Sequence, residues 1–131
     1  MSFKKGYTLV EVLIAALILG LTLSVIMAGL VGCIALNAAS RNYTSATEHA
    51  QLIMEEIRNT AFGSIATNIT SGTWTLNTAG VTAKGLTALN SESITTTSSG
   101  STVLDVTVTV FWNDLNSRVR SLTLRTSIAN I

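Results

Sequence analysis

Proline is absent from the 131 residues, histidine and cysteine occur once each, and charged residues make up only 11% of the chain. The single cysteine, Cys33, excludes an intramolecular disulfide. The absence of proline removes the commonest cause of a kink in a long helix. A net charge of +1 gives no overall field that would attract nucleic acid or an anionic surface. Partners must therefore be selected by local patches of residues.

Side chains that could carry catalysis are few and do not cluster. The only histidine, His49, follows Glu48 in a predicted helix, where we expect a solvated polar position. Glu55 and Glu56 are adjacent and therefore point to different helix faces. Neither a catalytic triad nor a metal-ligand set nor a phosphate-binding loop emerges. We expect a protein that is not an enzyme and that binds no cofactor.

Charge is also missing from one continuous stretch near the start, Val12 to Ser40, of about 29 residues. A helix of that length measures about 43 Å, which exceeds a hydrocarbon core of about 30 Å. It is also far longer than the apolar region of a secretory signal peptide, roughly 7 to 15 residues. We therefore expect a transmembrane helix. Lys4 and Lys5 precede it and predict a cytoplasmic N-terminus, with the residues after about 40 outside.

The helical pattern continues beyond the apolar run as an amphipathic stripe. With no proline or glycine between Cys33 and Phe62, one helix is predicted from about Thr8 to about Thr60, ending before Gly63. Its apolar residues recur at alternating spacings of three and four. They are Leu36, Ala39, Tyr43, Ala46, Ala50, Ile53 and Ile57.

The second half of the chain shows the alternation of β-strands. Thr73 to Leu76 and Val103 to Trp112 are predicted strands, and the second has one strongly apolar face. Turn residues follow at Asn113 to Ser117. Arg118 to Ile128 then returns with Leu122, Leu124 and Ile128 on one face, so a C-terminal antiparallel hairpin is predicted.

Two stretches show no such pattern. Ser64 to Gly85 is expected to be irregular, and the low-complexity stretch Ser91 to Thr102 is expected to be a mobile loop. Because a few strands do not form a stable sheet alone, the helix stripe is expected to cover the apolar strand face. The predicted fold class is α+β, with one long N-terminal helix, transmembrane and then amphipathic, packed on a small antiparallel sheet.

Simple anchoring does not explain Glu11. Inserting a carboxylate into the bilayer costs up to ~3 kcal/mol at depth and less at the interface, so such a residue is a candidate functional residue. No basic residue follows it within the apolar run, so its partner must come from Lys4, Lys5, lipid or another molecule. If the chain were cut after Gly6, a neighbouring subunit staggered along the helix axis could present the new amine at Tyr7.

The segment KKGYTLVEV, followed by an uncharged helix, resembles the class III signal of type IV pilins and of the pseudopilins of type II secretion. The resemblance implies that a membrane-embedded prepilin peptidase cleaves after Gly6 and that Tyr7 becomes N-methylated. Lys4 and Lys5 would be the basic leader residues, and Glu11 the carboxylate used in assembly.

The segments EHAQLIMEEIR and VTVTVFWNDLNSRVRSLTLRTSI are similar to minor pilins and minor pseudopilins. Tyr7 stands where phenylalanine is usual in the family. The helix-kinking proline and the C-terminal disulfide of many major pilins have no counterpart here. These features favour a minor subunit over a major one.

The resemblance also implies an organisation. Residues 1–6 would be a leader, 7–40 the transmembrane and filament-core half of the helix, and 41–131 an exported globular domain. The implied function is a structural subunit of a type IV pilus or related filament, with a minor pseudopilin of a type II secretion system as the alternative. Implied partners are the prepilin peptidase, other pilin or pseudopilin subunits and an inner-membrane assembly platform. The precursor would lie in the bacterial inner membrane, and the assembled filament would be periplasmic or extracellular.

The turn after Trp112 offers a candidate metal site. Asn113, Asp114 and Asn116 could supply the oxygen ligands that calcium prefers. A hairpin turn uses the same residue types, so we expect a turn and no bound metal.

Three arginines near the end of the chain offer a candidate nucleic-acid site, as in some competence pilins. Arg118, Arg120 and Arg125, with Trp112 nearby, form only a weak basic footprint. A solvated strand end accounts for the same residues, so we do not expect nucleic acid as a partner.

Overall fold

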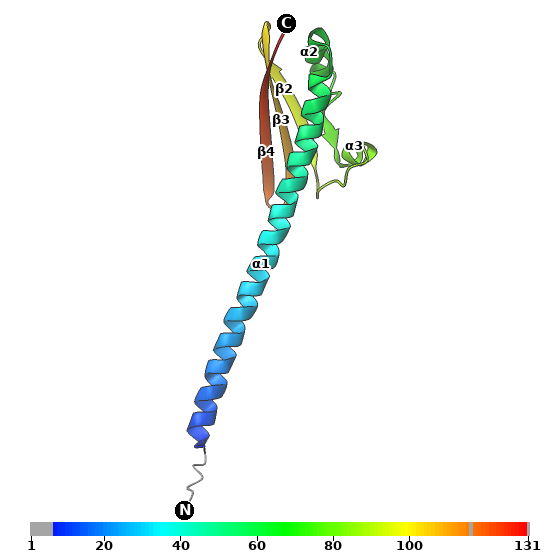
Figure 1. Ribbon diagram of the computed structural model, residues 1–131. Coiled ribbons are helices and arrows are strands. Elements are labelled where there is room, and N and C mark those ends of the chain that lie inside the picture. Colours follow the sequence, from blue (N-terminus) through cyan, green and yellow to red (C-terminus); the bar gives the residue numbers. More distant parts are fainter. Residues whose placement is uncertain (1–6, 116, 131) are drawn as a thin grey trace, which may run out of the picture. The chain divides into compact units, whose positions relative to one another are not determined.

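The computed structural model describes residues 7–115 and 117–130 (Figure 1). The chain divides into two compact units, with the boundary between Ala38 and Ala39. The first unit contains the beginning of helix α1, and the second contains the rest of that helix, two short helices and a sheet.

Helix α1 spans Leu9–Arg58, 50 residues. It starts and ends within two residues of the predicted limits, Thr8 and Thr60, and continues through the whole apolar run. Among the described residues, α1 is the one helix that is long and apolar enough to cross a membrane. In the first unit its large apolar side chains are exposed from Leu9 to Leu36.

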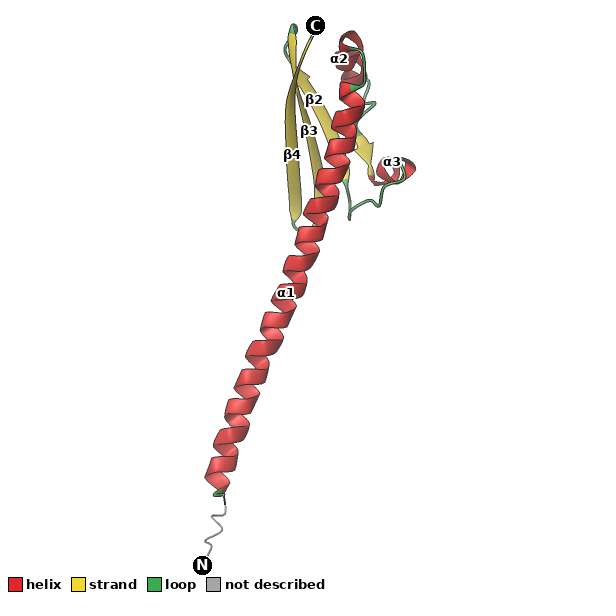
Figure 2. Cartoon of the chain, in the orientation of Figure 1, coloured by secondary structure: helices red, strands yellow, loops and turns green. Residues whose placement is uncertain are grey.

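The second unit contains a four-stranded antiparallel sheet in the order β1-β2-β3-β4 (Figure 2). Its strands are β1 (Leu76–Asn77), β2 (Ser93–Ser99), β3 (Val103–Asn113) and β4 (Val119–Ala129). The predicted hairpin is confirmed, because β3 and β4 pair along their full length from Val103↔Ala129 to Asn113↔Val119.

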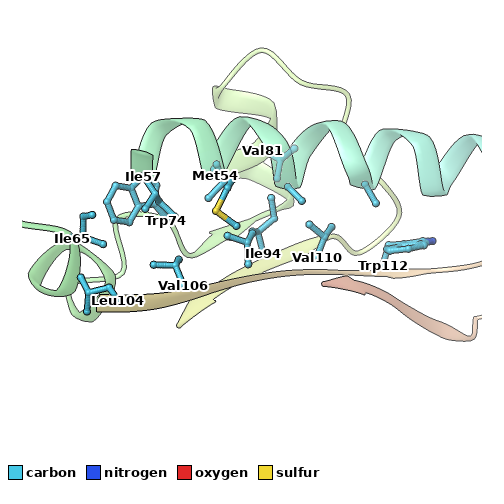
Figure 3. Packing of buried hydrophobic residues seen from close by; sticks show 14 residues of the cluster. Met54, Ile57, Ile65, Trp74, Val81, Ile94, Leu104, Val106, Val110 and Trp112 are labelled. Carbon is cyan, nitrogen blue, oxygen red and sulfur yellow. The ribbon is translucent and has the colours of Figure 1, made fainter. Parts of the chain in front are cut away.

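The core of this unit lies between the end of α1 and one face of the sheet (Figure 3). Alternate side chains of β3 are buried, as the period of two predicts. They are Leu104, Val106, Val108, Val110 and Trp112. Each such side chain contributes about 1.5–3 kcal/mol when fully buried. The predicted α+β arrangement, a long helix packed on a small antiparallel sheet, is confirmed.

The amphipathic stripe of α1 packs as predicted only in its later part. Ala46, Ala50 and Ile57 are fully buried, whereas Leu36, the first residue of the predicted stripe, belongs to the first unit and is 72% exposed. Tyr43 lies edge-on to Trp112, with ring centroids 5.1 Å apart, and is itself partly exposed. Periodicity identified the apolar face but not how far the sheet extends along it.

The prediction of a mobile loop at Ser91 to Thr102 was wrong, because most of this stretch forms β2. Ile94 is fully buried on the core side of the strand. The Thr96 hydroxyl is also buried and donates a hydrogen bond to the Trp74 carbonyl over 3.1 Å. Threonine has a high β propensity, and a hydroxyl with a partner can be buried at little cost. Low complexity therefore did not mean disorder here.

Two short helices occupy much of the stretch predicted to be irregular, Ser64 to Gly85. Helix α2 spans Phe62–Thr70 and buries Ile65, and helix α3 spans Thr78–Ala83 and buries Val81. Asn77 caps α3, since its Oδ1 accepts a hydrogen bond from the Gly80 amide over 2.9 Å. The predicted strand Thr73 to Leu76 is reduced to β1, a two-residue strand that begins where the prediction ended.

Candidate processing and assembly site

Glu11 lies in the first turn of α1 and is hydrogen-bonded to Thr8. Its Oε2 accepts hydrogen bonds from the Thr8 amide over 3.0 Å and from the Thr8 hydroxyl over 3.1 Å. In return the Glu11 amide donates to Thr8 Oγ1 over 3.3 Å. This reciprocal pattern is a capping box, which satisfies amide groups that the first turn of a helix leaves free.

The capping box gives Glu11 a local structural role that the sequence analysis did not consider. The signal was present as Thr8-Leu9-Val10-Glu11, the threonine-x-x-glutamate spacing of the motif. Both hydrogen bonds to the carboxylate use one oxygen, Oε2. The cap therefore does not require the other oxygen, which can accept a hydrogen bond from another group.

The predicted processing residues precede this cap in the sequence. Tyr7 precedes Thr8 directly and its side chain is 87% exposed. Gly6, Lys4 and Lys5 lie outside the described residues. The described residues that follow the predicted cleavage point are thus a solvent-accessible tyrosine and then a capped helix start.

The first unit presents an apolar surface on all sides of α1. Every residue from Tyr7 to Asn37 is exposed. Cys33 is among them and is a free thiol. A Cβ atom placed on Gly20, Gly29 or Gly32 would meet nothing within 4 Å. An exposed apolar surface of this extent marks contact with lipid or with other protein surfaces.

The structure does not bring the three candidate arginines together. Arg120 lies opposite Trp112 in the β3–β4 register, and Arg125 lies opposite Thr107. A separation of five residues along a strand corresponds to a distance of about 17 Å and places the two side chains on opposite faces of the sheet. Arg120 Nε also lies 3.4 Å from Asp114 Oδ2. Arg118 precedes β4 in the turn. This arrangement does not favour a compact nucleic-acid footprint.

One of the candidate calcium ligands, Asp114, is used by the turn. Asp114 Oδ1 accepts a hydrogen bond from the Leu115 amide over 2.8 Å, and the Asp114 amide donates to the Arg118 carbonyl over 2.8 Å. Asn113 is the last residue of β3, and Asn116 lies outside the described residues. Within the described residues, no group of three histidine, cysteine, aspartate or glutamate side chains could hold a metal ion.

The expectation that His49 is solvated was wrong. The side chain is 3% exposed, and its Nδ1 lies 2.7 Å from Glu92 Oε1. Glu92 Oε2 accepts a hydrogen bond from the Leu89 amide over 2.7 Å, and the Thr78 hydroxyl donates to the Glu92 carbonyl over 3.2 Å. This buried network connects α1, α3 and the turn before β2. It joins parts of one folded unit, which is a structural role.

The burial of His49 could have been predicted from the sequence, but the burial of Glu92 could not. His49 comes three residues after Ala46 and four before Ile53, which places it on the buried face of the helix. Glu92 lies in a serine- and threonine-rich stretch without an apolar pattern around it. Only the tertiary structure shows that the two side chains meet.

In a comparison with protein-family models, residues 1–30 match the prokaryotic N-terminal methylation motif. The match covers the basic residues, Gly6, Tyr7 and the capping box. No curated protein and no solved structure matches the chain. Proteins with this motif are substrates of prepilin peptidase and are structural subunits rather than enzymes. The methylation motif, together with the long apolar helix and the antiparallel sheet, supports a type IV pilin-like prepilin.

Proposed function

We propose that the chain is a structural subunit of a type IV pilus or a related filament, such as the pseudopilus of a type II secretion system. It would be made as a membrane precursor, cleaved after Gly6 and methylated on the new amine of Tyr7. The observation that carries this proposal is the methylation motif at residues 1–30, which coincides with an exposed apolar helix start.

The residues around the cleavage point have distinct roles in this proposal. Lys4 and Lys5 would hold the leader on the cytoplasmic side, because basic residues are retained there. After cleavage, Tyr7 would carry the terminal amine, one residue before the capping threonine. The amine of one subunit would then pair with Glu11 of a neighbour, whose carboxylate uses only Oε2 in its own cap. Such a pair would fix the stagger between neighbouring helices.

We place the chain among the minor subunits. The segments that are similar to minor pilins and minor pseudopilins form the later part of α1 and the β3–β4 hairpin, and both contribute to the core of the second unit. The single cysteine rules out an internal disulfide. The second unit would face the periplasm or the cell exterior and would select the partners of the filament.

Mass spectrometry of the protein extracted from the inner membrane of cells with a prepilin peptidase tests the processing step. The expected mass is that of residues 7–131 plus one methyl group. The variant Gly6→Val should remain at the precursor mass, because a side chain would obstruct an extended backbone in the peptidase cleft. An intact wild-type precursor, or a processed Gly6→Val variant, would contradict the proposed cleavage site.

A further inference from the structure

The two edges of the sheet differ. On one side, β1 covers part of the edge of β2 by pairing with Ile94 and Ser93. Further along β2, the Trp74 carbonyl accepts a hydrogen bond from the Thr96 hydroxyl. On the other side, β4 ends the sheet (Figure 1). Within the described residues, β3 is the only strand that pairs with this eleven-residue strand. Alternate backbone groups of β4 therefore point away from the sheet without a strand to bind.

β4 lacks several of the features that protect an edge strand from further pairing. Natural edge strands are protected by short length, a bulge, proline, charged side chains and lysine in particular, or a covering helix or loop. β4 pairs with β3 over eleven consecutive positions without a bulge, and it contains neither proline nor lysine; its charged residues are Arg120 and Arg125. Its geometry is that of a strand able to accept another strand.

The core side of β4 is also incompletely covered. None of its eleven residues is buried, and even Leu122, Leu124 and Ile128 on the core side are only half-buried. Beside them is a groove between α1 and β4. It is lined by Gln51, Met54, Glu55, Arg58, Leu124 and Arg125. An added strand could place alternate side chains over this groove while its backbone pairs with β4.

The charge at this edge indicates what kind of strand would fit. β4 carries Arg120 and Arg125 and no acidic residue, and Arg118 precedes it. Within the described residues, Arg118 and Arg125 form no ion pair. A second copy of β4 would add two more arginines and no carboxylate, and like charges in neighbouring strands are destabilising. An acidic strand from a different polypeptide fits better.

We propose that the free edge of β4 and the adjoining groove bind an extended, acidic segment of another protein by strand addition. Main-chain hydrogen bonds to β4 would provide the pairing, and the arginines would select acidic side chains. The proposal concerns residues 39–131 and does not depend on cleavage after Gly6, so the two can fail separately.

The test uses the full chain in detergent micelles and a fluorescent eleven-residue peptide that alternates glutamate with valine. A peptide with lysine in place of glutamate is the matched control probe. Fluorescence anisotropy should show binding of the acidic peptide and binding at least about tenfold weaker for the lysine peptide. Hydrogen exchange should show slower exchange of β4 amides when the acidic peptide is bound.

Two double variants test whether binding depends on the arginines at the β4 edge or only on the net charge of the protein. Arg118→Glu with Arg125→Glu should weaken binding of the acidic peptide at least about tenfold. Arg41→Glu with Lys84→Glu makes the same change in net charge at residues outside β3 and β4, and it should leave binding unchanged. Equal binding of both peptides, or protection outside β4, would overturn the proposal. Concentration-dependent protection of β4 without peptide would identify a second copy as the occupant and would also overturn it.

Discussion

Glu11 combines a structural role with a proposed assembly role, and alanine substitution would remove both. Losing a cap costs a helix about 1 kcal/mol, so a Glu11→Ala defect alone would not identify the cause. Glutamine also serves as the reciprocal residue of a capping box but carries no charge. It can therefore separate the cap from the charge.

We predict that Glu11→Gln abolishes incorporation into filaments as completely as Glu11→Ala, because the neighbouring amine needs a negative charge. Thr8→Ala, which removes the capping hydroxyl but keeps the carboxylate, should still be incorporated. Immunoblotting of sheared filaments against the membrane fraction measures this. Normal incorporation of Glu11→Gln would mean that the residue acts only as a cap.

The buried pair of His49 and Glu92 leads to a second prediction. His49→Ala would leave Glu92 Oε1 buried without its side-chain partner, and leaving a buried polar group unsatisfied costs about 1–3 kcal/mol. Urea unfolding followed by tryptophan fluorescence measures this loss in the full chain, because both tryptophans, Trp74 and Trp112, lie in the core of the second unit.

The matched control for this prediction is the exposed neighbour Glu48. Glu48→Ala should change the free energy of unfolding by less than about 0.5 kcal/mol. A His49→Ala variant as stable as Glu48→Ala would show that the buried pair adds nothing to the stability of the fold.

At the scale of the elements, the hairpin between β2 and β3 depends on Gly100. This residue has φ of 100°, a conformation that favours glycine, and an added Cβ would collide with the Val103 carbonyl oxygen. Gly100→Ala should therefore destabilise the protein by about 2 kcal/mol or more. The same urea titration measures the change.

Gly63 provides the comparison for Gly100. It lies within α2, and an added Cβ would meet nothing within 4 Å. Gly63→Ala should leave stability unchanged or raise it by up to about 1 kcal/mol, since alanine is the better helix former. Equal effects of the two substitutions would contradict the role assigned to the β2–β3 turn.

Elements with a regular apolar pattern were predicted closely, and elements held by single contacts were missed. Helix α1 and the β3–β4 hairpin each repeat one period over many residues. β2 is identified by little more than Ile94, because Thr96 is buried through a hydrogen bond to Trp74 that no local pattern reveals. The short helices α2 and α3 each bury a single large apolar residue, Ile65 and Val81 respectively.

The same distinction applies to the candidate site. The processing motif is a contiguous stretch of sequence, and the comparison with family models matches it at residues 1–30. The edge of β4 could not be recognised before the strand order was known, since an edge is defined by which neighbours are absent. The contact between His49 and Glu92 joins residues 43 positions apart.

At the scale of the whole molecule, the boundary at Ala38 and Ala39 predicts that residues 39–131 fold independently. This fragment contains all the buried core residues in the part of the chain that the structure describes, from Ala46 to Trp112. We expect it to be soluble without detergent and to unfold cooperatively in urea, with the same midpoint as the full chain in micelles. Size-exclusion chromatography and tryptophan fluorescence check this. Aggregation or gradual unfolding of the fragment would contradict it.

The exposed apolar surface of the first unit has an energetic consequence for a filament subunit. The hydrophobic effect depends on removing apolar area from water. Lipid tails and neighbouring apolar helices both exclude water, so moving this helix from one to the other changes its hydration very little. For the filament subunit proposed above, the bilayer and the filament core would then be environments of similar hydration free energy, and the helix would pass from one to the other without unfolding.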